Sequence, residues 1–291
     1  MIVRTPRYTI CTYTTLFRCP RDAMQGIKEF IPTEKKIEYI NSLLKVGFDT
    51  IDFGSFVSPK AIPQMRDTAK VIEGLDISYG NTKLLAIIAN ERGADDACDF
   101  EEIEYLGFPF SISEEFQRRN TNSSIEESYD RVRDIQEICQ INNKQLVVYI
   151  SMAFGNPYGE KWDPEIVAKW IDKLEKEGIS IFSLADTTGV SSPESIKYLY
   201  KNIIYDYPTL EIGVHLHSTP ENAQEKIKAA LEVGCNRIDS AIRGFGGCPM
   251  AEDELVGNIS TENVLAVLKD KSNINEDNFK IAQTKSFEIF I

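Results

Sequence analysis

Glu211-Ile-Gly-Val-His-Leu-His-Ser-Thr219 opens a segment in which a strand, a helix and a second strand follow one another. Apolar residues alternate over Glu211–His217, which is typical of a β-strand. The helical pattern over Thr219–Val233 ends at Gly234, where a helix C-cap favours a left-handed residue, and a further strand is expected at Arg237–Ala241. Such a strand–helix–strand unit is the building block of a parallel sheet.

The first strand of this unit contains both histidines of the chain, His215 and His217. Side chains alternate along a strand, so residues two apart share a face and the two imidazoles are expected to point the same way. Neutral imidazole is the commonest metal-ligating side chain, and such a pair can fill two positions around a cation. The alternative is a pair of ordinary histidines that hydrogen-bond to backbone carbonyls in a half-buried strand.

The same alternation runs along nearly the whole chain. Seven further strands precede or follow in the same pattern: Thr12–Phe17, Thr50–Gly54, Lys83–Ala89, Tyr105–Ser111, Gln145–Ser151, Ile179–Ala185 and Arg237–Ala241. Helices are expected between them: Thr33–Val46, Pro59–Ile72, Ala94–Glu101, Ile125–Asn142, Pro164–Glu177, Pro193–Tyr205 and Thr219–Val233. Glycines at 47, 178 and 234 mark repeated helix ends. Eight such units favour a closed (β/α)8 barrel over an open sheet.

The barrel is predicted to run from about residue 8 to 270, within a single domain that spans residues 1–291. A helix over Thr261–Lys269 closes it, and a tail over residues 271–291 follows. The tail is rich in Asn and Asp, which indicates partial mobility. Its apolar residues are expected to pack back on the barrel: Phe279, Ile281, Phe287 and Ile289.

Composition narrows the class of protein. The 291 residues are 42% hydrophobic and 26% charged, typical of a globular protein, and no apolar run has the ~18 residues of a membrane span. The amino terminus lacks the pattern of a secretion signal, which favours a cytoplasmic location. Six cysteines without short paired spacings favour reduced thiols. The net charge of −13 opposes nucleic acid as a partner, since neutralising phosphates requires excess Lys and Arg.

The carboxyl ends of barrel strands are where active residues gather. Selecting residues at these ends gives one set that would face one cavity: Arg21, Asp22, Asp52, Ser55, Asp186, Thr187, His215, His217, Cys248 and Asn258. Four of them form a mixed oxygen and nitrogen shell with one anionic ligand: Asp22, His215, His217 and Asn258. This shell suits octahedral Mg²⁺ or Mn²⁺ more than structural zinc.

The glycine-rich segment Gly244–Pro249 contains Cys248. Glycines let a loop move over a pocket, and a thiol with a free pKa of ~8.5 can exchange a proton near neutrality. Cys248 is therefore a candidate acid. The alternative is a tight turn with an incidental thiol.

Several motifs resemble those of the hydroxymethylglutaryl-CoA lyase family, a group of metal-dependent barrels. They are Cys19–Gln25, Gly54–Met65, Ser123–Ser128, Ser183–Gly189, the His-x-His strand, Gly244–Pro249 and Gly257–Glu262. The matches run in family order from about residue 12 to 270. The resemblance implies a carbon–carbon lyase that cleaves 3-hydroxy-3-methylglutaryl-CoA into acetyl-CoA and acetoacetate, a reaction of leucine degradation and ketone-body formation, and it implies a homodimer.

The resemblance also implies roles for residues. The four oxygen and nitrogen ligands would hold Mg²⁺ or Mn²⁺, Arg21 would stabilise the enolate of the thioester, and Cys248 would assist proton transfer. Asp52 and Asp186 are further catalytic candidates, although Asp52 is equally well explained as a structural carboxylate. The residues expected to contact the acyl-CoA are Gln25, Lys28, Ser55 and Thr187. Solvated surface charge is the alternative for Lys28.

Three departures from the family pattern concern the chemistry. Phe17 stands where the family has a glutamate, Asp52 replaces a second glutamate, and Ser218 replaces the aspartate after the two histidines. They leave the metal ligands intact but put the acyl substrate in question. Two alternatives follow: a related enzyme that condenses or cleaves another hydroxy or keto acid, and a catalytically silent barrel that binds a CoA ester.

Overall fold

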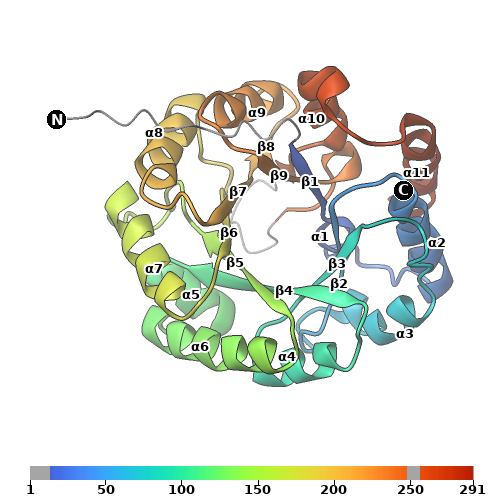
Figure 1. Ribbon diagram of the computed structural model, residues 1–291, viewed down its shortest axis with the longest axis horizontal. Coiled ribbons are helices and arrows are strands. Elements are labelled where there is room, and N and C mark those ends of the chain that lie inside the picture. The colour runs from blue at the N-terminus through green and yellow to red at the C-terminus, as the bar shows by residue number, and fades with distance from the viewer. Residues whose placement is uncertain (1–13, 248–255, 291) are drawn as a thin grey trace.

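Eight parallel strands close into a barrel in the computed structural model, which describes residues 14–247 and 256–290 (Figure 1). The strands follow the order of the chain around the barrel and are β1 (Thr15–Arg18), β2 (Thr50–Ser55), β3 (Lys83–Ile87), β4 (Ile103–Ser111), β5 (Gln145–Ser151), β6 (Ile181–Ala185), β7 (Glu211–His215) and β9 (Arg237–Ser240). The last strand, β9, pairs with β1 and closes the ring. The predicted (β/α)8 fold is confirmed.

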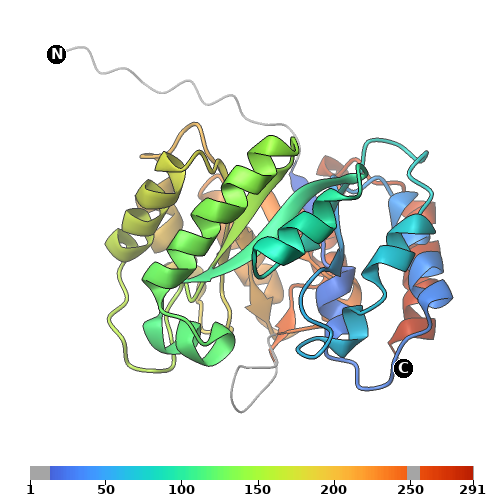
Figure 2. The ribbon, with the colours of Figure 1, turned by 90° about the horizontal axis from the view of Figure 1, so that it is seen from below.

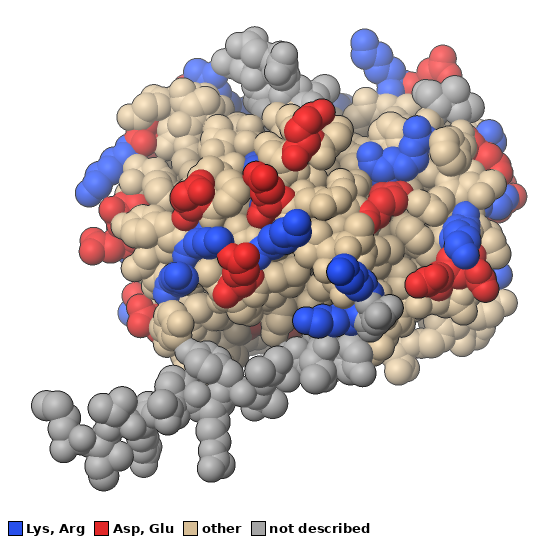
Figure 3. All heavy atoms as spheres, turned by 90° about the horizontal axis from the view of Figure 1, so that it is seen from above, with Lys and Arg blue, Asp and Glu red and all other residues tan. Residues whose placement is uncertain are grey.

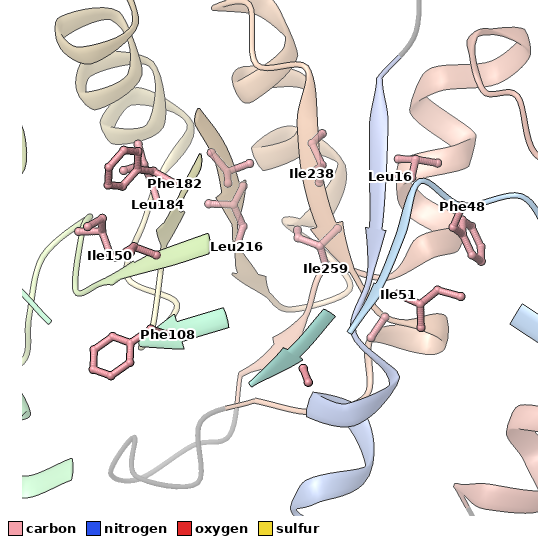
Figure 4. Close-up of a cluster of buried hydrophobic side chains, with 14 of the residues drawn as sticks. Leu16, Phe48, Ile51, Phe108, Ile150, Phe182, Leu184, Leu216, Ile238 and Ile259 are labelled. Carbon is pink, nitrogen blue, oxygen red and sulfur yellow. The ribbon is translucent and has the colours of Figure 1, made fainter. Parts of the chain in front are cut away.

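The strands bury side chains on both faces. Apolar residues such as Leu16, Ile150 and Ile238 lie on the outer faces and pack against the helices (Figure 4). A smaller cluster lies on the inner faces, where Phe17 and Tyr149 belong to the filling of the barrel. Burial on both faces explains why β3, β5 and β6 read as nearly continuous apolar runs.

Eleven α-helices are present in the described residues, and most surround the barrel (Figure 1). They are α1 (Pro20–Gln25), α2 (Thr33–Leu44), α3 (Thr68–Glu73), α4 (Glu91–Cys98), α5 (Glu114–Thr121), α6 (Ile125–Ile141), α7 (Pro164–Lys176), α8 (Pro193–Ile204), α9 (Ala223–Glu232), α10 (Thr261–Leu268) and α11 (Glu276–Ile289). Short 3-10 turns occupy Pro63–Met65, Ile242–Gly244 and Lys269–Lys271.

The predicted helix ends are confirmed at three glycines. Gly47, Gly178 and Gly234 have φ angles of 86°, 89° and 90° after α2, α7 and α9. This left-handed conformation is strained for residues with a Cβ, so glycine lets the chain turn from each helix into the next strand. Serine capping boxes start α6 at Ser124 and α8 at Ser192.

Most of the tail forms helix α11, which packs against α2 (Figure 2), and its partial mobility stays a prediction. The side chain of Asn275 caps its amino end, accepting a hydrogen bond from the Asn278 N–H at 3.0 Å. Phe279 and Ile289 are buried as expected, whereas Ile281 and Phe287 are more than half exposed.

Two other elements differ from their predictions. The single helix expected over Pro59–Ile72 is instead the turn Pro63–Met65 followed by α3, because Pro63 cannot donate a backbone hydrogen bond inside a helix. The strand expected over Glu211–His217 ends at His215. His217 and Ser218 form a separate strand, β8, which pairs antiparallel with β10 (Gly257–Asn258). We call this pair of short strands the β8–β10 ribbon.

Among the described residues, no helix combines the length and apolar character needed to cross a membrane. Acidic and basic side chains are interspersed on the face drawn in Figure 3. The predicted start of the barrel near residue 8 falls outside the described residues, so the full extent of the domain stays a prediction.

Candidate active site

The β1–α1 junction supplies the first charged pair of the site. α1 starts at Pro20, whose fixed φ suits a first helical position, and the next two residues are Arg21 and Asp22. Both are buried, and Arg21 Nη1 donates to Asp22 Oδ1 at 3.0 Å. Arg21 Nε and Nη2 also donate to Asp52 Oδ2, at 3.0 and 2.6 Å. One guanidinium is therefore shared by two carboxylates.

The two carboxylates respond differently to burial. Burial raises the pKa of Asp52 to about 6, despite the opposing effect of Arg21. Burial also acts on Asp22, but Arg21, His215 and a hydrogen bond from Asn258 together outweigh it and lower its pKa. Asp22 is thus held as the anion, which is the form that binds a cation.

The two histidines converge although the strand breaks between them. His215 ends β7 and His217 begins β8, yet their Nε2 atoms lie 3.3 Å apart. Burial and the neighbouring His215 lower the pKa of His217 to about 4, so its ring is neutral at pH 7. Two nitrogens of the metal-binding type thus face one point, as the alternation of side chains predicted.

Asp239 on β9 fixes the orientation of His215. Its Oδ2 lies 3.3 Å from His215 Nδ1 and accepts a hydrogen bond from Ser183 Oγ at 3.0 Å. Burial would lower the pKa of His215, but the hydrogen bond and charge of Asp239 raise it. A carboxylate on Nδ1 favours the tautomer that leaves Nε2 free for a ligand.

Asn258 completes the group from the last part of the barrel. Its Nδ2 donates to Asp22 Oδ2 at 2.6 Å and to the Phe245 carbonyl at 2.9 Å. Its Oδ1 is buried and has no hydrogen-bond partner among the described residues. Gly246, with a φ of 99°, passes so close that a Cβ there would lie 2.5 Å from Asn258 Nδ2 and 2.8 Å from Asp22 Oδ2.

These residues fit a divalent cation. Their donor set combines one anionic carboxylate, two imidazoles and an amide oxygen for which the described residues supply no partner, and such mixed oxygen and nitrogen ligands suit Mg²⁺ or Mn²⁺. A second group, Cys19, His215 and Asp239, also has ligand atoms within 4.8 Å of one another. We favour the first set, because His215 Nδ1 is engaged by Asp239 and because burial and nearby carboxylates raise the pKa of the Cys19 thiol well above its usual value.

Three other predicted site residues have hydrogen bonds within the protein. Asp186 accepts hydrogen bonds from Ser191 and from Lys226. Thr187 Oγ1 accepts from the Met152 N–H at 2.9 Å, and Ser55 Oγ accepts from the Val57 N–H at 3.2 Å. Each of these bonds stabilises a loop that follows a strand.

The remaining predicted residues lie around the β1–α1 junction or outside the described chain. Gln25 is partly buried and exchanges hydrogen bonds with Arg21 and Asp22. Lys28 is exposed and follows the end of α1. Cys248 lies outside the described residues, so its role stays a prediction.

Three residues of the site were not predicted: Asp239, Arg237 and Lys226. Asp239 and Arg237 alternate with Ile238 along β9 and therefore point inward, a signal that the strand pattern contains. The Arg237 guanidinium lies 3.8 Å from the centre of the Phe17 ring, where the resembled family has a glutamate. Gly213 leaves room for it, because a Cβ there would lie 2.7 Å from Arg237 Cγ.

Comparison with known proteins gives consistent matches. The family model described as HMGL-like matches residues 14–288. The cytoplasmic 3-hydroxy-3-methylglutaryl-CoA lyase of Rattus norvegicus is 34% identical over 269 residues, which are 92% of this chain and 78% of that protein. Hydroxymethylglutaryl-CoA lyase YngG of Bacillus subtilis is also 34% identical, over 86% of this chain and 83% of that protein.

Solved structures agree with the sequence matches. An HMG-CoA lyase from Acinetobacter baumannii, in complex with coenzyme A and 3-methylmalate, has a TM-score of 0.88 and 29% identity, covering 96% of this chain and 91% of its own. The HMG-CoA lyase of Bacillus subtilis has the same TM-score at 31% identity, covering 95% and 93%.

Proposed function

The chain belongs to the HMGL-like family of carbon–carbon lyases, and on this premise we propose that it cleaves 3-hydroxy-3-methylglutaryl-CoA into acetyl-CoA and acetoacetate. Two pairs of residues beside Arg21 support the proposal: His215 and His217, whose Nε2 atoms lie 3.3 Å apart, and Asp22 and Asn258, which share a hydrogen bond of 2.6 Å. The charge of Asp22 also interacts with both histidines. These residues come from the first and last units of the barrel, and the Oδ1 of Asn258, which has no partner among the described residues, argues for a ligand there.

The family depends on a divalent metal, and we assign Mg²⁺ or Mn²⁺ to these four residues. Asp22, His215, His217 and Asn258 would hold the cation, and a bound cation would supply Lewis-acid chemistry that makes a substrate hydroxyl more acidic when the hydroxyl and carboxylate oxygens of the substrate coordinate it. The protein contributes a buried setting in which the Asp22 carboxylate stays ionised and His217 stays neutral. Both residues therefore hold the protonation state that metal binding requires.

Arg21 is assigned to the thioester end of the substrate. Its guanidinium stays protonated and is aligned by Asp52, Asp22 and Gln25, so its orientation is set before the substrate arrives. A preorganised positive charge would stabilise the negative charge that develops on the thioester oxygen when the carbon–carbon bond breaks. Asp52 acts here mainly by holding Arg21, because both of its oxygens accept from that side chain.

Proton transfer to the released enolate is assigned to Cys248, whose loop begins at Gly246 and Gly247 beside the ligands. Lys28, which is exposed after α1, is assigned to the phosphates of CoA. Gln25, Ser55 and Thr187 would line the path of the acyl-CoA. The homodimer and the cytoplasmic location remain predictions from the resemblance and the sequence.

Turnover of 3-hydroxy-3-methylglutaryl-CoA tests the proposal directly. With Mg²⁺ or Mn²⁺ we expect equal amounts of acetyl-CoA and acetoacetate, which a coupled acetoacetate assay and mass spectrometry would measure. Chelation should abolish product, and His217→Ala should lower kcat/KM by at least ~100-fold through loss of a ligand. Absence of acetoacetate with every metal tested would reject this substrate.

Phe17 and Ser218 justify parallel assays with related acyl-CoA thioesters. Phe17 is buried under the Arg237 guanidinium, so the inner barrel has an aromatic ring at the position where the resembled family has a carboxylate. If another 3-hydroxyacyl-CoA has the higher kcat/KM, the reaction class stands and the substrate assignment changes.

A further inference from the structure

Lys226 is a charged side chain sealed inside the protein next to the candidate metal ligands. It lies on α9 and is 1% exposed. Its Nζ donates three hydrogen bonds: to the His217 carbonyl at 2.7 Å, to Asp186 Oδ2 at 3.0 Å and to the Gly189 carbonyl at 3.1 Å. An ammonium group has three protons, so every donor of Lys226 is used.

The acceptor at 2.7 Å belongs to the β8–β10 ribbon. In this ribbon His217 lies directly opposite Asn258, and Ser218 lies opposite Gly257. Two of the four candidate ligands are thus paired on two strands of two residues each. Strands this short have little intrinsic stability, so their position depends on what anchors them.

The other two acceptors connect the ribbon to the loop after β6. Asp186 is fully buried, and its carboxylate also accepts from the N–H and Oγ of Ser191, at 3.0 and 2.5 Å. Gly189 packs so closely on Val256, just before β10, that a Cβ there would lie 2.9 Å from Val256 Cγ1. Lys226 therefore connects β8 to the loop after β6. Val256, the residue just before β10, packs against the same loop.

We propose that Lys226, held by Asp186, is a positioning residue that sets where His217 and Asn258 present their ligand atoms. The inference rests on the metal site assigned under the proposed function. Lys226 does not touch the substrate or the cation; it acts through the backbone of His217. Asp186 then contributes to the reaction as the counter-charge that keeps the ammonium group buried, because an unpaired buried charge is strongly disfavoured.

A buried Lys–Asp pair could serve stability alone, and the chain contains a matched case for comparison. Lys36 on α2 is 1% exposed and donates to Asp67 Oδ1 at 2.6 Å and to the Gln64 carbonyl. This pair connects α2 to the turn before α3 and contacts none of the four candidate ligands. Removing it should lower stability without changing the geometry of the metal site.

The test measures Mn²⁺ binding by electron paramagnetic resonance, together with thermal unfolding. The variants are Lys226→Met/Asp186→Asn, Lys226→Gln/Asp186→Asn and the control Lys36→Met/Asp67→Asn. Neutralising both members of a pair avoids an unpaired buried charge, which improves the chance that each variant folds. Met and Gln are similar in size, but only Gln keeps an N–H that can donate to the His217 carbonyl.

We expect the Met variant to raise the Kd for Mn²⁺ by about 10-fold or more, the usual range for loss of a group that orients a ligand. The Gln variant should recover part of that loss, and the control should stay within about 2-fold of wild type although its Tm falls. Equal Mn²⁺ affinity in wild type and the Met variant would overturn the inference, as would an equal loss in the control. Failure of wild type to bind Mn²⁺ would instead reject the proposed metal site.

If the Met variant does not fold, the Gln variant decides the question. A folded Gln variant that binds Mn²⁺ more weakly than the control supports a role in positioning. A Gln variant whose Kd and Tm both match those of the control would overturn it, since its effect would then be one of stability alone.

Discussion

Arg21 divides a single positive charge between Asp22 and Asp52. Asp22 has other sources of stabilisation, since Asn258 donates to it and the two histidines act on its charge. Asp52 is 1% exposed, and burial outweighs the stabilisation by Arg21 and the smaller effect of His215, so its pKa rises to about 6. At the scale of single residues, sharing one guanidinium therefore keeps one carboxylate ionised and leaves the other close to titration near neutral pH.

The raised pKa of Asp52 predicts how its contribution to the free energy of unfolding changes with pH. Its pKa is about 6 in the folded protein against ~3.9 in an unfolded chain, so the folded state binds more protons between these values. The stability that protonated Asp52 provides is thus complete below pH ~4 and is lost as the pH rises through about 6. We expect the unfolding free energy of wild type minus that of Asp52→Asn to fall by about 2 to 3 kcal/mol between pH 4 and 7.

Urea denaturation of metal-free protein at several pH values measures this difference. Asp130→Asn, on the exposed side of α6, is the control and should show a much smaller change with pH. If the unfolding free energy of wild type minus that of Asp52→Asn grows with pH, Arg21 outweighs burial and the pKa of Asp52 is depressed.

Individual ligands were predictable where a strand pattern was clear. The alternation around His215 and His217 predicted that both imidazoles share a face, and their Nε2 atoms do lie together. Lys226 was not predicted as a site residue. Its spacing from Ala223 and Ala230, three and four residues away, does assign it to the buried face of α9.

The last helix is coupled to the site through one aromatic stack. The rings of Phe245 and Phe290 lie 4.6 Å apart, nearly parallel at 18°, and the Phe245 carbonyl accepts a hydrogen bond from Asn258. Arg243 adds a contact, with its guanidinium 4.2 Å from the centre of the Phe287 ring. The end of α11 thus supports the backbone at Phe245, whose carbonyl helps to orient the candidate ligand Asn258.

We predict that Phe245 and Phe290 stabilise the protein jointly. In a double-mutant cycle with Phe245→Ala and Phe290→Ala, the coupling energy should be about 0.5 to 1.5 kcal/mol, as measured for stacked aromatic pairs. Chemical denaturation of the four proteins gives the value. Phe279→Ala is the control partner for Phe245→Ala, because Phe279 packs on Phe48 instead, and this pair should be additive. A coupling near zero between Phe245 and Phe290 would argue against this support.

At the scale of elements, long periodic segments could be predicted and short ones could not. The eight strands and most helices follow from regular patterns, whereas the β8–β10 ribbon has two residues in each strand, too few to give a pattern. No helix bounds were predicted within the tail. Asn275 is in fact the cap of α11, and Phe279, Ala282, Ser286 and Ile289 follow a helical spacing.

On the scale of the whole molecule, the site joins the first and last units of the barrel. Asp22 follows β1, Asn258 lies beyond β9, and β1 pairs with β9 where the barrel closes. A ligand bound to both residues would oppose opening of the barrel at this junction. Binding to the folded state alone raises its stability by mass action.

Removal of metal should therefore lower the melting temperature. Mn²⁺ at ~100 times its Kd adds about 2.7 kcal/mol, which corresponds to a rise in Tm of roughly 4 °C for a chain of this size. Differential scanning calorimetry of chelated and Mn²⁺-loaded protein measures the shift. His217→Ala should lose most of the shift, and an unchanged Tm in wild type would contradict binding to the folded state.

The bond between Asp22 and Asn258 spans 236 positions of the chain. A ribosome synthesising this protein releases the aspartate early and the asparagine only near the end, so a nascent or prematurely terminated chain cannot assemble the cluster. The capacity to bind a cation there would consequently be acquired late in biosynthesis, after the final strand has joined the first. Uptake of manganese by ribosome-bound chains of increasing length would then mark the moment of ring closure.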